Sequence, residues 1–156
     1  MRKLFTGTGV ALVTPFKNGV VDYDGLERLI NHNIEGGVEF LVSLGTTGES
    51  VTLTEEEQHA VLDFTVKVVA GRVAVVAGFG GNNTAALIQK IKKYHFKGID
   101  GILSASPSYN KPTQEGIYQH FMAVAANAPR PIILYNVPGR TGSNVSAETT
   151  LELAIL

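Results

Sequence analysis

Short apolar runs recur along this chain at a spacing of roughly 30 residues, the length of one strand plus one crossover helix. The runs begin near Val10, Phe40, Val73, Gly101 and Pro131. Each is short and continuous, which is typical of a strand that is buried on both faces of a parallel sheet. The repeat therefore predicts a parallel βα array whose functional groups lie at the carboxyl ends of its strands.

Between these runs the apolar residues change to helical spacing, and a residue that often caps helices precedes each stripe. The clearest start is Thr54, because Glu57 three positions later completes a capping box. The other expected N-caps are Asn83 or Thr84, Thr113 and Ser146, and the first helix is expected to follow Asp22. Strands and helices are therefore predicted to alternate over the whole sequence.

The charge balance points away from polyanionic partners. The sequence has 13 basic and 14 acidic residues, a formal net charge of -1, and no run of either sign. Nothing suggests a nucleic-acid or membrane surface, so we expect a small molecule or another copy of the chain as partner. No apolar run approaches the roughly 20 residues that span a bilayer, and the zero cysteines fit a reducing cytoplasm. We expect one soluble, cytoplasmic domain over residues 1–156.

Polar segments follow the ends of the second, fourth and fifth runs: GTTGES at Gly45–Ser50, SPSYNKP at Ser106–Pro112 and YNVPGRTG at Tyr135–Gly142. In the first segment, glycines on either side of two threonines let backbone N–H groups and hydroxyls approach an anion. The same pattern also fits a glycine-rich turn in which Ser50 or Thr54 caps the next helix. The pattern alone leaves both interpretations open.

Three single residues in the other two segments are candidates for chemistry. Tyr135 ends a buried strand, where a tyrosine is either a satisfied core residue or a proton carrier. Tyr109 lies between Pro107 and Pro112, which would hold an exposed aromatic ring rigidly. Arg140 lies on a flexible, glycine-flanked turn, where its guanidinium is suited to bidentate binding of a carboxylate.

Two other patterns favour ordinary structural roles. The segment Gly78–Asn83 lacks the third glycine of a dinucleotide-binding loop, and is predicted to be a strand-to-helix turn. The four histidines show no metal-binding spacing and are expected to be surface or interface residues. They are His32, His59, His95 and His120.

Longer motifs occur in the order and spacing of one known family. They lie at Val10–Phe16, Gly45–Ser50, Ser108–Pro112, Gln114–Phe121 and Tyr135–Gly142. In these motifs the whole chain resembles the N-terminal part of the dihydrodipicolinate synthase family of pyruvate-dependent class I aldolases. The resemblance implies a (β/α)8 TIM barrel, of which residues 1–156 would form about the first five βα units and stop before the sixth strand.

The resemblance also implies an activity, the condensation of pyruvate with aspartate 4-semialdehyde through a lysine Schiff base, toward lysine and diaminopimelate. By matching position, Thr46, Tyr109 and Tyr135 would form a proton relay, with Tyr109 reaching across from a neighbouring copy. Thr47 would hold the pyruvate carboxylate, and Arg140 would orient the relay and receive the carboxylate of the aldehyde. No cofactor or metal would be needed, and the assembly would be a homotetramer, a dimer of dimers.

The motifs do not supply the lysine that forms the Schiff base. In the family it stands on the sixth strand, and the lysines of this chain flank strands or lie on helices that look solvated, where a lowered pKa is not expected. They are Lys3, Lys17, Lys67, Lys90, Lys92, Lys93, Lys97 and Lys111. The chain alone is expected to be inactive, and its open strand edges are expected to promote association. Two alternatives stay open: N-acetylneuraminate lyase or a related keto-acid aldolase, and a non-catalytic half-barrel.

Overall fold

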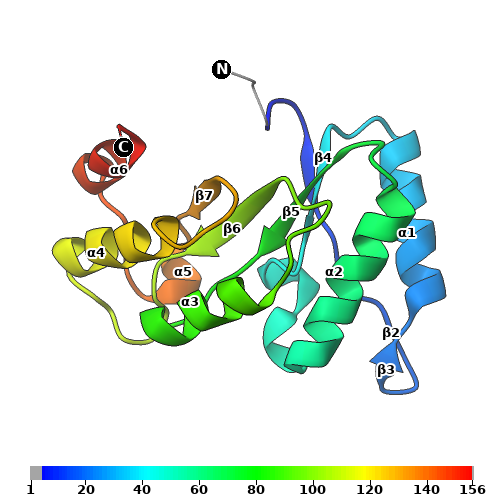
Figure 1. Ribbon diagram of the computed structural model, residues 1–156, viewed down its shortest axis with the longest axis horizontal. Coiled ribbons are helices and arrows are strands. Elements are labelled where there is room, and N and C mark those ends of the chain that lie inside the picture. Colours follow the sequence, from blue (N-terminus) through cyan, green and yellow to red (C-terminus); the bar gives the residue numbers. More distant parts are fainter. Residues whose placement is uncertain (1–4, 156) are drawn as a thin grey trace. The chain divides into compact units, whose positions relative to one another are not determined.

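The computed structural model describes residues 5–155, which form two compact units. The N-terminal unit contains the chain up to Gly78 together with Lys97–Ile102. The C-terminal unit contains Phe79–Phe96 and the chain from Leu103 onward. Figure 1 labels the helices and strands of both units.

Within the described residues, five strands form one sheet in the order β1-β4-β5-β6-β7. Their bounds are β1 Gly9–Ala11, β4 Phe40–Ser43, β5 Ala74–Gly78, β6 Gly101–Ala105 and β7 Ile132–Tyr135. Strand β4 runs parallel to both β1 and β5, with Leu41 opposite Val10 and Val75. The predicted βα array is confirmed, and each strand begins within one residue of its predicted start.

A short antiparallel hairpin, β2 (Phe16–Lys17) and β3 (Val20–Val21), lies between β1 and the first helix. Its turn consists of Asn18 and Gly19, whose φ angles are 54° and 82°. Asn-Gly suits this turn because both positions need left-handed backbone. The apolar repeat does not predict the hairpin, although the Asn-Gly pair is a strong local signal for one.

In the N-terminal unit, helices α1 (Tyr23–Glu35) and α2 (Glu55–Val69) pack against each other (Figure 1). Both begin where the sequence predicts. The Asp22 carboxylate accepts a hydrogen bond from the Gly25 amide, and Thr54 and Glu57 form the complete capping box. The apolar faces of the two helices and of β4 and β5 form the core, which includes Leu26, Ile30, Leu41, Val61, Leu62, Val75 and Val76.

One prediction for this unit is wrong. The first strand was expected to be buried on both faces, but Gly9 and Ala11 are exposed and Val13 is 46% exposed. Side chains alternate along extended chain, so Leu12 and Thr14, which are buried, point to the opposite side from Ala11 and Val13. Helices cover only one face of β1 in the described part of the chain, and an apolar run by itself does not reveal this.

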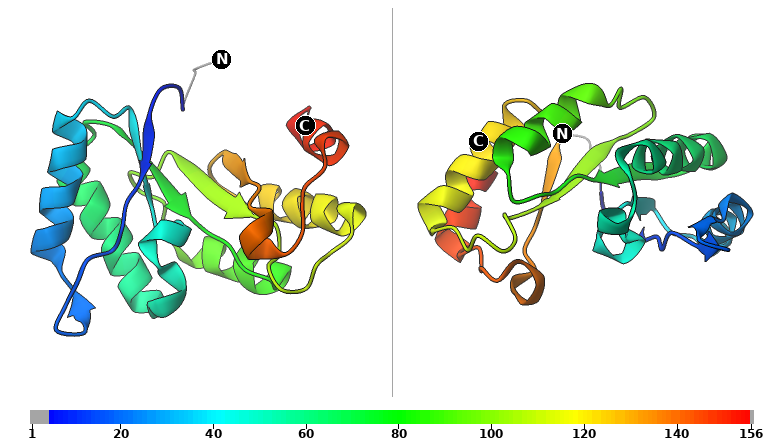
Figure 2. Two further views of the ribbon diagram at one scale, coloured as in Figure 1. Left: turned by 180° about the vertical axis from the view of Figure 1, so that it is seen from behind. Right: turned by 90° about the horizontal axis from the view of Figure 1, so that it is seen from below.

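In the C-terminal unit, helices α3 (Thr84–Lys93) and α4 (Gln114–Ala125) lie side by side, as both Figure 1 and Figure 2 show. The short helix α5 (Pro138–Thr141) and helix α6 (Ala147–Ala154) follow β7. The predicted N-caps Asn83, Thr113 and Ser146 each accept a hydrogen bond from an amide of the first turn. A core cluster joins α4, β7 and α6 through Ile117, Phe121, Leu134, Val145 and Leu153. No helix within residues 5–155 has both the length and the apolar character needed to cross a membrane.

Candidate active site

The predicted site residues divide between the two units, and all lie at or after the carboxyl end of a strand. Thr46 and Thr47 come just after β4 in the N-terminal unit. Tyr109 follows β6, Tyr135 is the last residue of β7, and Arg140 lies five residues later, all in the C-terminal unit. Loops at this end of parallel strands carry the chemistry in most enzymes of this architecture.

The GTTGES segment folds into two short 3-10 turns, Thr46–Gly48 and Ser50–Thr52. Thr46 and Thr47 are exposed, whereas Gly48 is buried against Leu12 and Thr14, which follow β1. A Cβ atom on Gly48 would lie 3.1 Å from the Leu12 carbonyl oxygen, and the Thr14 hydroxyl donates a 2.7 Å hydrogen bond to the Gly48 carbonyl. Packing beneath this loop therefore fixes its backbone while leaving both threonine side chains at the surface.

The two interpretations of this segment turn out to be compatible. The amides of Gly48 and Glu49 bond to the carbonyls of Gly45 and Thr46 and are not available to a ligand. The first amides of a helical turn have no partner within the turn, so those of Thr46 and Thr47 can face an anion together with the two hydroxyls. Of the two candidate caps, the structure uses Thr54 for α2.

The end of β4 is also held by a close backbone approach. Leu44 has a φ angle of 57°, which turns the chain sharply into Gly45. A Cβ atom on Gly78, at the end of β5, would lie 2.1 Å from the Leu44 carbonyl oxygen. Only glycine fits at position 78, and this contact sets where the GTTGES loop begins.

Tyr109 lies on a loop that is held by hydrogen bonds. Its side chain is 87% exposed, as predicted, and its φ angle is 70°. Its amide donates a 3.3 Å hydrogen bond to the Thr141 carbonyl, and the Asn110 side chain donates a 3.0 Å bond to the Asn82 carbonyl. Two hydrogen bonds therefore support the loop, in addition to the flanking prolines that the sequence pointed to.

Tyr135 is partly buried, and the chain after it is clamped by side chains. The side-chain nitrogen of Asn136 donates a 2.8 Å hydrogen bond to Asn144 Oδ1. The backbone N–H of Val145 donates a 3.2 Å bond to Asn136 Oδ1. Arg140 is exposed within α5, so the turn predicted there takes a helical form, and its flexibility stays a prediction. Pro138 suits the first position of this helical turn.

Gln114 is a supporting residue whose role the sequence analysis missed. Its side-chain nitrogen donates a 2.7 Å hydrogen bond to the backbone carbonyl of Asn144. Its side-chain oxygen accepts bonds of 2.9 Å from the Ser146 amide and from the Thr149 hydroxyl. Gln114 thus ties the start of α4 to the start of α6, and its place in the Gln114–Phe121 motif was the available signal.

The expectation for the histidines is wrong at one position. His120 is only 3% exposed, and burial lowers the pKa of its imidazole below the usual value. His120 belongs to the apolar stripe of α4 with Ile117, Phe121 and Val124, at the i, i+3, i+4 and i+7 spacing of a buried helix face. That spacing, and not the missing metal pattern, is the signal in the sequence for a buried histidine at this position.

No lysine among the described residues is buried, and only Lys90 is partly so. A lysine that forms a Schiff base near neutral pH needs a desolvated or positively charged setting to lower its pKa. Lys3 lies outside the described residues.

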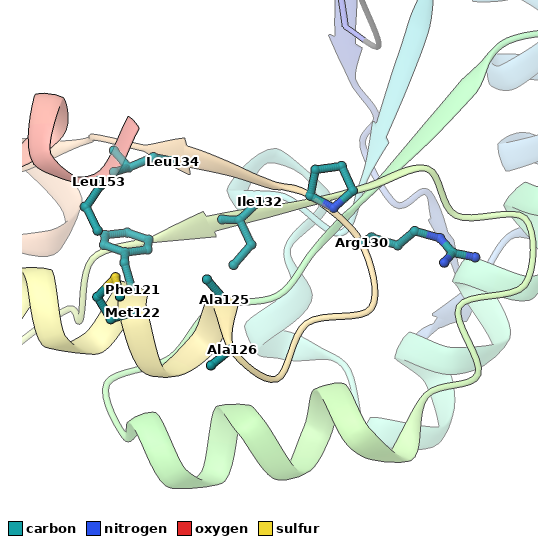
Figure 3. Close-up of a pocket in the computed structure, with 9 residues that line it drawn as sticks. Phe121, Met122, Ala125, Ala126, Arg130, Ile132, Leu134 and Leu153 are labelled. Carbon is teal, nitrogen blue, oxygen red and sulfur yellow. The ribbon is translucent and has the colours of Figure 1, made fainter. Parts of the chain in front are cut away.

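The C-terminal unit also contains an apolar groove of about 430 Å³ that none of the predicted site residues lines (Figure 3). Phe121, Leu134 and Leu153 meet at one end of it, and the Arg130 side chain extends away from the other. The groove includes Ile132, the first residue of β7, and so lies nearer the amino end of that strand than Tyr135. We do not assign it to the candidate active site.

Comparison with known proteins places the chain in a family. The Dihydrodipicolinate synthetase family model matches residues 4–156. A 4-hydroxy-tetrahydrodipicolinate synthase of Parabacteroides distasonis is 53% identical over 149 residues, 95% of this chain and 50% of that protein. One of Flavobacterium psychrophilum is 55% identical over 151 residues, 96% of this chain and 52% of that protein.

Solved structures agree with this assignment. Dihydrodipicolinate synthase from Aquifex aeolicus superposes with a TM-score of 0.91 at 47% identity, over 97% of this chain and 52% of that one. A protein described as the first monomeric dihydrodipicolinate synthase variant superposes with a TM-score of 0.93 at 44% identity, over 97% of this chain and 50% of that one. The predicted fold class, a (β/α)8 barrel represented by about five βα units, is confirmed. The chain spans about half the length of the relatives it matches, and it belongs to the dihydrodipicolinate synthetase family.

Proposed function

We propose that this chain is the N-terminal part of a single (β/α)8 barrel domain with 4-hydroxy-tetrahydrodipicolinate synthase activity. This lyase would condense pyruvate with aspartate 4-semialdehyde through a lysine Schiff base, in the biosynthesis of lysine and diaminopimelate. The observation that carries the proposal is the position of Thr46, Tyr109 and Tyr135, each at or just after the carboxyl end of a strand in a chain of this family.

Proton transfer would depend on three hydroxyl groups. Tyr135 would act as general acid and base at the Schiff-base carbon, and Thr46 would pass the proton. Tyr109 would connect this relay to solvent from a neighbouring copy, and its 87% exposure within the single chain supports that arrangement. The working assembly would be a homotetramer built as a dimer of dimers, in the cytoplasm.

The two carboxylates of the reaction would bind at different groups. Thr47 would hold the pyruvate carboxylate with its hydroxyl and amide, at the loop whose backbone is fixed by packing. Arg140 would orient the relay and bind the carboxylate of the semialdehyde through its exposed guanidinium. The reaction would need no cofactor or metal, because the Schiff base itself activates pyruvate.

The nucleophilic lysine would lie outside this chain. The support for this is that the described lysines are exposed or only partly buried, so none has the dry setting that the chemistry requires. The alternative of N-acetylneuraminate lyase is not favoured, because the relatives reported above are named as 4-hydroxy-tetrahydrodipicolinate synthases.

Borohydride trapping with pyruvate tests the proposal. The 156-residue chain should give no reduced adduct by mass spectrometry, whereas the full-length protein should give one on a lysine beyond Leu156. An adduct on a lysine within residues 5–155 would mean that the nucleophile has been misidentified. Absence of any adduct in the full-length protein would count against the proposed aldolase activity.

A further inference from the structure

A group of buried polar side chains in the C-terminal unit has no part in the proposed proton relay. His120 on α4 is 3% exposed, Ser104 on β6 is fully buried, and Ser106 just after β6 is 2% exposed. In the described part of the chain, His120 Nε2 and the hydroxyl oxygens of both serines have no hydrogen-bond partner. Buried polar atoms are nearly always bonded, so these three need an explanation.

The three side chains face the same layer of the unit. Ser104 and Ser106 alternate with Leu103 and Ala105, so they share the side of β6 that carries the fully buried Ile102. Helices α3 and α4 pack against each other and cover one face of β6 (Figure 2). The burial of Ile102, Ser104 and Ser106 indicates that these side chains point toward that covered face. His120 lies in the buried stripe of α4 and is turned toward α3, where the Thr84 hydroxyl and His120 Nδ1 share a 2.8 Å hydrogen bond.

The charged residues of the elements packed around His120, as far as the structure describes them, lie away from its ring. The charged residues of α3 are Lys90, Lys92 and Lys93, all in its last turn, whereas Thr84 is its first residue. The charged residue of α4 is Glu115, whose carboxylate accepts a hydrogen bond from Gln119 at the exposed surface. Strand β6 carries none. The neutral imidazole is therefore the form that fits, with one ring nitrogen bonded to Thr84 and the other directed into the layer.

The same groups surround the loop that carries Tyr109. Ser106 begins that loop, and α4, which contains His120, follows it directly. The segment from Asn82 to Thr84 is bonded from two sides, by the Asn110 side chain at the Asn82 carbonyl and by His120 at the Thr84 hydroxyl. Movement of α4 relative to α3 would therefore shift the end of the Tyr109 loop that leads into α4 relative to the Asn82 carbonyl, to which Asn110 bonds.

We propose that His120 is a positioning residue for Tyr109. Its ring joins α4 to α3 through Thr84, and its Nε2 joins α4 to the end of β6 through one buried water shared with Ser104 and Ser106. A water with three polar partners is the usual solution for such atoms. The catalytic importance of Tyr109 rests on the proposed function. The contacts that position its loop are independent of that function.

The test compares variants of the full-length protein by amide hydrogen exchange and by steady-state kinetics. His120→Phe keeps an aromatic ring in the buried stripe of α4 and removes both bonds. It should raise exchange at the Tyr109 and Asn110 amides, which bond to the Thr141 and Ser108 carbonyls, by about tenfold or more. It should lower kcat by about tenfold and change the KM for pyruvate by less than about twofold, because the carboxylate site is on another loop.

Rescue variants separate positioning from packing. His120→Gln places an amide near the Nε2 position but leaves the Thr84 hydroxyl without its Nδ1 partner, so it should restore exchange and kcat only in part, to about the level of Thr84→Val. Thr84→Val, which removes only the Nδ1 partner, is the second test if His120→Phe does not fold, and it should raise exchange in the same loop. The matched control is His32→Gln, at an exposed histidine of α1, which should change neither quantity.

Several outcomes would overturn the proposal. If His120→Phe folds and the exchange of the Tyr109 loop is unchanged, His120 does not position Tyr109, whether or not kcat falls. A crystal structure in which no water lies between Nε2 and the two serines would remove the proposed link to β6. Failure of the wild type to form a borohydride-trapped pyruvate adduct would instead count against the proposed function, and the exchange measurements would still decide the role of His120.

Discussion

The two strand-end loops that carry the predicted hydroxyl groups are held in different ways. The GTTGES loop is fixed by backbone packing, with Gly48 against the Leu12 carbonyl and Gly78 against the Leu44 carbonyl. The Tyr109 loop is exposed and is held by a few hydrogen bonds, with left-handed backbone at Tyr109 and Lys111. Fixed amides favour carboxylate binding, because they need no rearrangement when the ligand arrives. A surface position allows a side chain to reach another copy of the chain.

The largest expected effect is at the point where packing fixes the first loop. Gly78→Val would place a Cβ atom 2.1 Å from the Leu44 carbonyl oxygen, so β4 and β5 would have to separate at their ends. We expect the free energy of unfolding to fall by about 3 kcal/mol or more, measured by urea denaturation. Gly80→Ala is the control, because a Cβ there meets nothing within 4 Å, and a loss as large as that of Gly78→Val would contradict the packing argument.

The next effect concerns the hydrogen bond beneath the same loop. Thr14→Val keeps the side-chain shape and removes the 2.7 Å bond to the Gly48 carbonyl, which is buried. Leaving that carbonyl unpaired should cost about 1–3 kcal/mol in the same assay. Thr52→Val removes a similar but exposed bond to the Glu49 carbonyl and should cost less than about 0.5 kcal/mol. Equal losses for the two variants would mean that burial does not distinguish them.

Acid should act on the C-terminal unit through His120. Burial lowers the pKa of its imidazole in the folded state, so the unfolded chain binds the proton more readily. The contribution of this neutral imidazole to the free energy of unfolding is fully present above the ordinary pKa of 6.5. It is lost as the pH falls through the lowered pKa of the folded state. The slope for this one group is at most about 1.4 kcal/mol per pH unit. His120→Gln should remove this part of the pH dependence, and His32→Gln should retain it; identical profiles for both would refute the assignment.

The smallest expected effect is at the clamp after β7. Asn136→Ala removes the bonds to Asn144 and Val145 at an exposed position. We expect a loss of about 1 kcal/mol or less in unfolding free energy, together with faster amide exchange across residues 137–145. If Asn136→Ala instead unfolded the whole C-terminal unit, these hydrogen bonds would contribute as much to stability as the packing under the GTTGES loop does.

Local signals predicted most of the fold. Continuous apolar runs gave the five strands, and capping residues such as Thr54 and Thr113 gave the helix starts. The shortest elements were missed, because the hairpin at Asn18 and Gly19 and the helical turn at Arg140 involve too few residues for a periodic pattern. A pattern also cannot show which face of a strand is covered by other elements, which is why the exposure of Val13 was not predicted.

The candidate site was predictable only in part. Motifs identified Thr46, Tyr109, Tyr135 and their strand-end positions, because residue identity and order are local properties. The supporting contacts were not predicted, since the bonds of Gln114 to residues about 30 positions away depend on tertiary packing. Whether the two tyrosines and Thr46 meet is a question of how the two units are arranged, and it stays a prediction.

A crystal structure of the full-length protein with pyruvate tests the central claim most directly. The claim is that Thr46, Thr47, Tyr135 and Arg140 converge around the substrate at the carboxyl ends of the strands. We expect the hydroxyls of Thr46 and Tyr135 to lie within hydrogen-bond reach, directly or through one water, beside a pyruvate bound to a lysine beyond Leu156. Tyr135 turned toward the surrounding helices, or pyruvate bound away from Thr46 and Thr47, would contradict the account.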